Sequence, residues 1–97
     1  MNTLLKMSEK DNVAVCLADG KSGETLTLTA KDGGKLDPVR LMEEIPFAHK
    51  VALEDISLDD HIIKYGEIIG IATQQIKTGQ WVHVHNIEGL RGRGDKK

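Results

Sequence analysis

Aromatic residues, cysteine and proline are all scarce in this sequence. Aromatic side chains make up 3% of the 97 residues, and the chain has one cysteine and two prolines. With Phe47, Tyr65 and Trp81 as its aromatic residues, a folded core must consist mostly of Val, Ile and Leu. The single cysteine, Cys16, excludes an internal disulfide and lies in an apolar run. We therefore expect a buried, reduced thiol without a catalytic role, because a reactive thiol needs partial exposure and positive charge nearby.

Long apolar runs and an excess of positive charge are also missing. The sequence therefore predicts neither a signal peptide nor a membrane-spanning segment, and we expect a cytoplasmic protein with no membrane partner. The formal net charge of -2 argues against a nucleic-acid partner, because phosphate binding needs clustered positive charge. A chain of this length forms one small domain, and such domains often depend on a partner. A homodimer of the isolated chain is one option.

Short apolar segments separated by Gly- and Asp-containing turns predict a mainly β fold. The clearest half-buried strand is 24–29, where Leu and Thr alternate strictly. The least regular part is 30–44, where Asp37 followed by Pro38 is typical of a helix start, so we expect a short helix or a loop with one helical turn there. The other expected strands begin at Leu4 or cover residues 12–17, 50–53, 61–65, 68–72 and 81–87.

The expected organisation is a polar lead-in over residues 1–10, one compact domain over 11–89 and a mobile basic tail over 90–97. Gly70 interrupts an apolar segment, which indicates a bulge or a close backbone approach. The tail has two glycines and almost no apolar side chains. Such a segment orders only against a partner.

The last expected strand carries the pattern Trp-Val-His-Val-His. Successive side chains of a strand point to opposite faces, which places His83 and His85 on one face with Trp81, and Val82 and Val84 on the core face. Two imidazoles on one face can converge on a metal, a bound anion or a transferring proton. The alternative is that both histidines lie on a solvated sheet face and have no functional role.

The order and spacing of several segments resemble the SAF domain of the altronate/galactarate dehydratase family. The segments are residues 45–53, 63–66, 69–72 and 79–86, and residues 90–95 resemble the end of that module. The resemblance implies a small β-clip fold, also seen in antifreeze-like domains, with at most one or two short helical turns. It also implies the separate small subunit of an altronate- or galactarate-like hydro-lyase that acts on sugar acids.

In that family the large subunit carries most of the active site, and Fe²⁺ or another divalent metal is typical of the holoenzyme. A related arrangement serves sulfolactate sulfo-lyase. The resemblance implies catalytic roles for His83 and His85, which are also the candidate metal ligands. It implies substrate binding by His49, Lys50, Lys64 and Asn86. Of the neighbouring pair Lys64 and Tyr65, we expect Tyr65 to be packed and Lys64 exposed.

Two departures from the family pattern concern backbone geometry. The family usually has Gly where this chain has Ala48 and Asp59. The difference matters if either position needs a positive φ, which Asp tolerates better than Ala.

Three interpretations of function remain. The chain is a lyase small subunit, a sugar-acid- or metal-binding module without turnover, or a structural module for assembly. Dehydration requires a base for the proton next to the carboxylate and help for the leaving hydroxide. The chain offers His and Lys groups but no dense catalytic cluster, so we expect a subunit that is inactive on its own.

Overall fold

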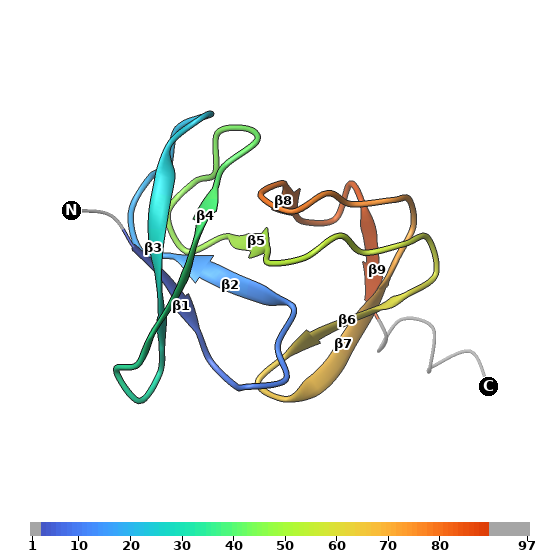
Figure 1. Ribbon diagram of the computed structural model, residues 1–97. Helices are drawn as coiled ribbons and strands as arrows, with labels where there is room; N and C mark the ends of the chain where they lie inside the picture. The colour runs from blue at the N-terminus through green and yellow to red at the C-terminus, as the bar shows by residue number, and fades with distance from the viewer. Residues whose placement is uncertain (1–2, 90–97) are drawn as a thin grey trace.

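The computed structural model describes residues 3–89, which form nine β-strands and no helix (Figure 1). This confirms the mainly β fold class. The described residues accordingly contain no helix able to cross a membrane. The strands are β1 (Thr3–Lys6), β2 (Val13–Cys16), β3 (Thr25–Ala30), β4 (Lys35–Arg40), β5 (Lys50–Ala52), β6 (His61–Lys64), β7 (Glu67–Ala72), β8 (Trp81–Val82) and β9 (Ile87–Gly89).

The strands form two separate sheets. One has the order β4-β3-β1-β2-β5-β8, and the other has the order β6-β7-β9. Figure 1 shows β3 and β4 at one end, β6, β7 and β9 at the other, and β2 and β5 between them. Ala14 pairs with Val51 and both pack in the first core, whereas Val13 pairs with Ala52 and both pack in the second. Because neighbours in a strand face opposite ways, β2 and β5 separate two hydrophobic cores.

The structure bears on two expectations for the first forty residues. Residues 3–6 form β1, in agreement with the strand expected to begin at Leu4, and β1 lies between β3 and β2 in the six-stranded sheet. Residues 35–40 form a strand, so the helix or loop expected there is wrong. Pro38 is tolerated because β4 is an edge strand, where a missing N–H need not break a ladder. The expected tail, 90–97, lies outside the described residues.

Three other expectations are confirmed. Leu26 and Leu28 on β3 are buried while the intervening Thr side chains are not. Cys16 is buried and is not part of a disulfide. At Gly70 a Cβ would lie 2.7 Å from the carbonyl oxygen of Glu88, so β7 and β9 approach more closely than a larger residue allows.

One turn recurs four times along the chain. Each copy starts at a buried residue, and three positions later the backbone has a positive φ. The next N–H then bonds back across the turn, as from His49 to the Pro46 carbonyl and from Gln80 to the Lys77 carbonyl. The positive-φ residues are Gly23 (84°), Ala48 (72°), Asp59 (75°) and Gly79 (90°). Both departures from the family's glycines therefore fall where the backbone is left-handed.

The turns are tied together in two equivalent pairs. Bridges join Gly20 to Ile45 and Ile56 to Ile76. The Asp19 carboxylate accepts the N–H of Phe47 at 2.8 Å, and in the second pair the Asp55 carboxylate accepts the N–H of Thr78 at 2.8 Å.

The ladders repeat in the same way. Cys16 and His49 bond through backbone atoms as Ala52 and Gln80 do. The domain thus contains two copies of one unit. Because β5 pairs with β8, the copies place His49 and Trp81 side by side.

Two buried polar residues join the sheets between β1 and β2. The Asp11 carboxylate accepts the N–H groups of Ser8, Tyr65 and Gly66 at 3.0, 3.0 and 2.8 Å. The Asn12 amide donates to the His61 carbonyl at 2.9 Å and accepts the Ile63 N–H at 2.8 Å, as a neighbouring strand would. A side chain therefore occupies an edge of β6.

We expect Asn12→Ala to lower the free energy of unfolding by about 2 kcal/mol, because two partly buried backbone groups of β6 lose their partner. Urea unfolding followed by circular dichroism measures the change. Replacement of the exposed Gln75 by Ala is the control and should change it by less than about 0.5 kcal/mol. Equal stabilities for the two variants would contradict the role of Asn12.

We expect Ala48→Gly to stabilise the domain. A side chain in the left-handed region costs about 1–2 kcal/mol, and the extra freedom of glycine in the unfolded chain offsets about 0.4–1 kcal/mol of that. The net gain should be about 0.5–1 kcal/mol in urea unfolding. Asp59→Gly should gain less, because Asp tolerates this conformation better.

Gly79→Ala is the matched opposite change at the equivalent position of another turn. It should destabilise, since its Cβ would collide with the Arg40 carbonyl oxygen. A loss of stability in Ala48→Gly would show that the left-handed backbone at residue 48 carries no strain.

Candidate functional site

Four ring side chains meet where β8 leaves its sheet: His49, Trp81, His83 and His85, here called the ring cluster. The His83 imidazole stacks on the Trp81 indole, with 5.3 Å between centroids and 12° between planes. His49 lies edge-on to both, 5.3 Å from Trp81 and 4.8 Å from His83. His85 lies 5.5 Å from Trp81. The structure thus brings together the three histidines named from the sequence, and adds Trp81 as their common support.

The chain around these histidines is not the continuous strand that alternation predicts. β8 ends at Val82, and residues 83–86 form a turn in which the His83 carbonyl accepts the N–H groups of Asn86 and Ile87 at 3.0 and 3.1 Å. Val84, expected on the core face, is 78% exposed. The expected strand over 81–87 is therefore wrong beyond Val82. His83 and His85 meet Trp81 by way of a turn.

Asn86 explains why the strand breaks. Its side-chain oxygen accepts the His83 N–H at 3.0 Å, and its side-chain nitrogen donates to the Trp81 carbonyl at 2.8 Å. The residue is buried, 4% exposed. Both ends of the amide are engaged within the turn. Asn86 thus holds His83 in position, and substrate binding by Asn86 stays a prediction.

Trp81 is held at both its ring and its backbone. Its indole N–H donates to Nδ1 of His49 at 3.1 Å. An accepting Nδ1 means that neutral His49 carries its proton on Nε2, which can donate to a ligand. The carboxylate of Glu43 accepts the Trp81 backbone N–H at 2.9 Å. Sequence analysis missed Glu43, because no local pattern marks a contact to a residue so far along the chain.

Positive charge gathers around the ring cluster. Partial burial lowers the pKa of His83, and the nearby charges of His49, Lys50 and His85 lower it further. Burial also lowers the pKa of Lys50, and the charge of Lys64 adds to this effect. Every charged group that shifts these two pKa values is positive. Such a surface favours an anionic ligand.

Lys64 and Tyr65 have the reverse of the expected burial. Lys64 is half-buried at the end of β6, whereas Tyr65 is 58% exposed. Tyr65 and Gly66, with φ values of 58° and 74°, form the two-residue turn between β6 and β7, and side chains in such a turn point outward. The Lys64 ammonium lies 5.1 Å from the Tyr65 ring centroid. Gly66 is structural, as expected.

Residues 2–90 match the family described as the altronate/galactarate dehydratase SAF domain. The chain belongs to this family.

Relatives of this SAF domain include both dehydratases and a sulfo-lyase subunit. It is 36% identical to an altronate dehydratase of Bacillus subtilis, over 89% of this chain and 16% of that protein. It is 39% identical to a galactarate dehydratase (L-threo-forming) of Escherichia coli, over 80% and 14%. It is 35% identical to a (2R)-sulfolactate sulfo-lyase subunit alpha of Chromohalobacter salexigens, over 84% and 87%. The chain thus spans about a sixth of the altronate dehydratase and most of the sulfo-lyase subunit.

The donor set of this SAF domain does not form a complete metal site. Within residues 3–89, no group of three or more His, Cys, Asp or Glu side chains is arranged to hold a metal ion. His83 and His85 pack against Trp81, and His49 uses Nδ1 to accept the indole N–H. A protein metal site normally needs at least three ligands. Metal ligation by His83 and His85 remains a prediction that would need ligands from another chain.

A surface pocket of the domain lies away from the ring cluster. It has a volume of about 470 Å³ and is lined by residues of the 6–9 and 30–36 segments. It shares no residue with the ring cluster. His85 and Val84 are exposed, so the ring cluster lies on an open surface that a second surface could cover.

We expect the imidazole of His83 to titrate below its ordinary pKa in the free domain, and Lys50→Gln to raise that pKa. Removing one neighbouring positive charge makes protonation of His83 easier, although burial still holds the pKa down. Proton NMR of the imidazole resonances against pH measures both values. Lys35→Gln removes an exposed lysine on β4 and is the control. An equal rise in both variants would show that only the net charge of the domain matters.

Proposed function

We propose that this SAF domain is the small subunit of a sugar-acid dehydratase, contributing the ring cluster and its lysines to an active site that a large subunit completes. The observation that carries the proposal is the ring cluster, in which three histidines pack around Trp81 and the charges that shift the pKa of His83 are all positive. The matches to an altronate dehydratase and a galactarate dehydratase support the substrate class.

The chemistry of dehydration suits these groups. A hydroxy acid loses the proton next to its carboxylate, and the hydroxyl one carbon further leaves as water after accepting a proton. The Nε2–H of His49 is suited to bind the carboxylate. His83 has a lowered pKa, so at neutral pH it is available in the neutral form that accepts a proton. The exposed His85 is the better placed of the two to meet a substrate held by another subunit.

The proportions of the relatives support a large partner. The dehydratase matches leave about five sixths of those chains without a counterpart here, and the name of the sulfo-lyase relative includes "subunit alpha". We propose that the missing part is a separate chain that covers the ring cluster. Fe²⁺ or another divalent metal would then be held mainly by that chain, where it would stabilise negative charge on the reacting acid.

A second candidate is the small subunit of a sulfolactate sulfo-lyase. The observation in its favour is coverage: the match includes 87% of the subunit alpha from Chromohalobacter salexigens. The reaction is the same kind of elimination, with sulfite leaving in place of hydroxide. The same cations would bind the carboxylate.

We expect His85→Gln and His83→Gln each to lower kcat of the assembled enzyme by about 10²-fold or more if they transfer protons. The assay uses the chain co-purified with its large subunit and a panel of altronate, galactarate and (2R)-sulfolactate. His61→Gln is the matched control, because His61 is exposed on β6 and outside the ring cluster. Circular dichroism checks that each variant folds.

The panel also separates the candidate functions. The chain alone should show negligible turnover, because it carries few catalytic groups. Release of sulfite would select the sulfo-lyase, and formation of a 3-deoxy-2-oxo acid from altronate or galactarate would select the dehydratase. Unchanged kcat and KM in both histidine variants would leave assembly as the role of the domain.

A further inference from the structure

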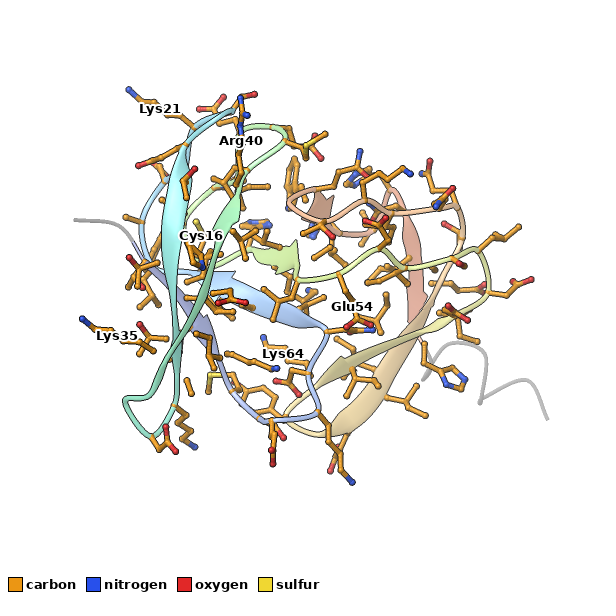
Figure 2. The ribbon with its side chains drawn as sticks, viewed as in Figure 1. Cys16, Lys21, Lys35, Arg40, Glu54 and Lys64 are labelled. Atoms are coloured by element: carbon orange, nitrogen blue, oxygen red, sulfur yellow. The ribbon has the colours of Figure 1, made fainter. Side chains whose placement is uncertain are left out.

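Lys50 and Lys64 belong to different sheets but face the same hydrophobic core. Lys50 lies two residues before Ala52 on β5, and Lys64 lies two residues after Ile62 on β6. Ala52 and Ile62 are both fully buried in the second core. Because alternate residues of a strand share a face, both lysine side chains leave on the side of that core, at its rim. Figure 2 shows Lys64 in the region between β2 and β6.

The two ammonium groups are close enough to repel. Lys64 is the charged group that lowers the pKa of Lys50, in addition to burial. Both side chains are half-buried. Two carboxylates lie near the end of β6. Asp11 already accepts three backbone N–H groups, and Glu67, which pairs with Lys64 across the β6–β7 ladder, is exposed to solvent. Two half-buried like charges destabilise a free domain, and an anion between them removes that repulsion.

This lysine pair is connected to the ring cluster through His83. The pKa of His83 responds to the charges of both His49 and Lys50. The strand register agrees, because Lys50 pairs with Val82, the residue before His83. A ligand held by His49 and His83 at one acid group would extend toward Lys50 and Lys64.

We propose that Lys50 and Lys64 form a second anion subsite beside the ring cluster, so that this domain selects hydroxy acids with two acid groups. Aldaric acids and sulfonated hydroxy acids carry a second carboxylate or a sulfonate, whereas aldonic acids end in an uncharged alcohol. The proposal rests on the proposed function for the identity of the ligand as a hydroxy acid. It goes further by naming which of its ends each group of residues binds.

The alternative is that Lys64 is an ordinary surface lysine held by the Tyr65 ring, 5.1 Å from its ammonium. In that case Lys64 affects all acids equally or none of them. A comparison of two acids that differ only in the second acid group separates the two possibilities. Galactarate and galactonate are such a pair.

The experiment titrates the ¹⁵N-labelled full chain with galactarate and with galactonate and follows backbone amide shifts by NMR. We expect galactarate to shift the amides of Lys50 and Lys64 as well as those of His49 and His83. Galactonate should shift only the histidine amides. Galactarate should bind about tenfold more tightly, which corresponds to about 1.4 kcal/mol.

Variants assign the difference to Lys64. Lys64→Gln should remove the preference for galactarate and leave the affinity for galactonate unchanged. Lys64→Arg retains the charge and should keep the preference. Lys35→Gln removes the same charge from β4, away from Lys64 in Figure 2, and should also keep it.

Equal affinity for the two acids, including no binding of either, overturns the subsite. A preference for galactarate that survives Lys64→Gln also overturns it. Neither result depends on turnover. A chain that discriminates between the acids through Lys64, but supports no elimination with any partner, would keep the subsite and lose the proposed function. An active complex without Lys64-dependent discrimination would do the reverse.

Discussion

The constraint on which this domain depends is a backbone that must turn left-handed at one position of each recurring turn. At Gly79 a Cβ would collide with the Arg40 carbonyl oxygen, so the chain can close there only with glycine. The turn then delivers Trp81 to the start of β8. The equivalent turn delivers His49 directly after Ala48. The ring cluster exists because these two turns are copies of one another and because their strands pair.

Strand edges in so small a domain need partners, and two asparagines supply them. Asn12 bonds the edge of β6, and Asn86 bonds the outer edge of β8 through the Trp81 carbonyl and the His83 N–H. Glu43 accepts the remaining N–H at that edge. Side chains that satisfy an edge also prevent it from pairing with another chain. At β8 the same interactions fix the position of His83. The residues that stabilise this edge therefore also set the geometry of the site.

Electrostatics sets the site apart from the rest of the molecule. The domain as a whole has a net charge of -2, yet His83 and Lys50 respond only to positive neighbours. Gathering like charges lowers stability unless an anion is bound. Polar groups that oppose folding are expected where a protein binds its ligand. The concentration of cations on an acidic chain therefore supports the proposed anion-binding role.

The sequence by itself determined the β class, the family and the residues worth examining. The alternation of Leu and Thr in residues 24–29 indicates a strand, because only a strand points every second residue inward. The order of motifs around His49, His83 and His85 identified the SAF domain. Only the tertiary structure decided the rest. Residues 35–40 form a strand because an edge of the sheet tolerates Pro38. The chain turns after Val82 because the Asn86 side chain accepts the His83 N–H there. The half-burial of Lys64 and its proximity to Lys50 depend on how two sheets pack. Local patterns report which side of a strand faces a core, but contacts between residues far apart in the chain are set by register and packing, which no local pattern contains.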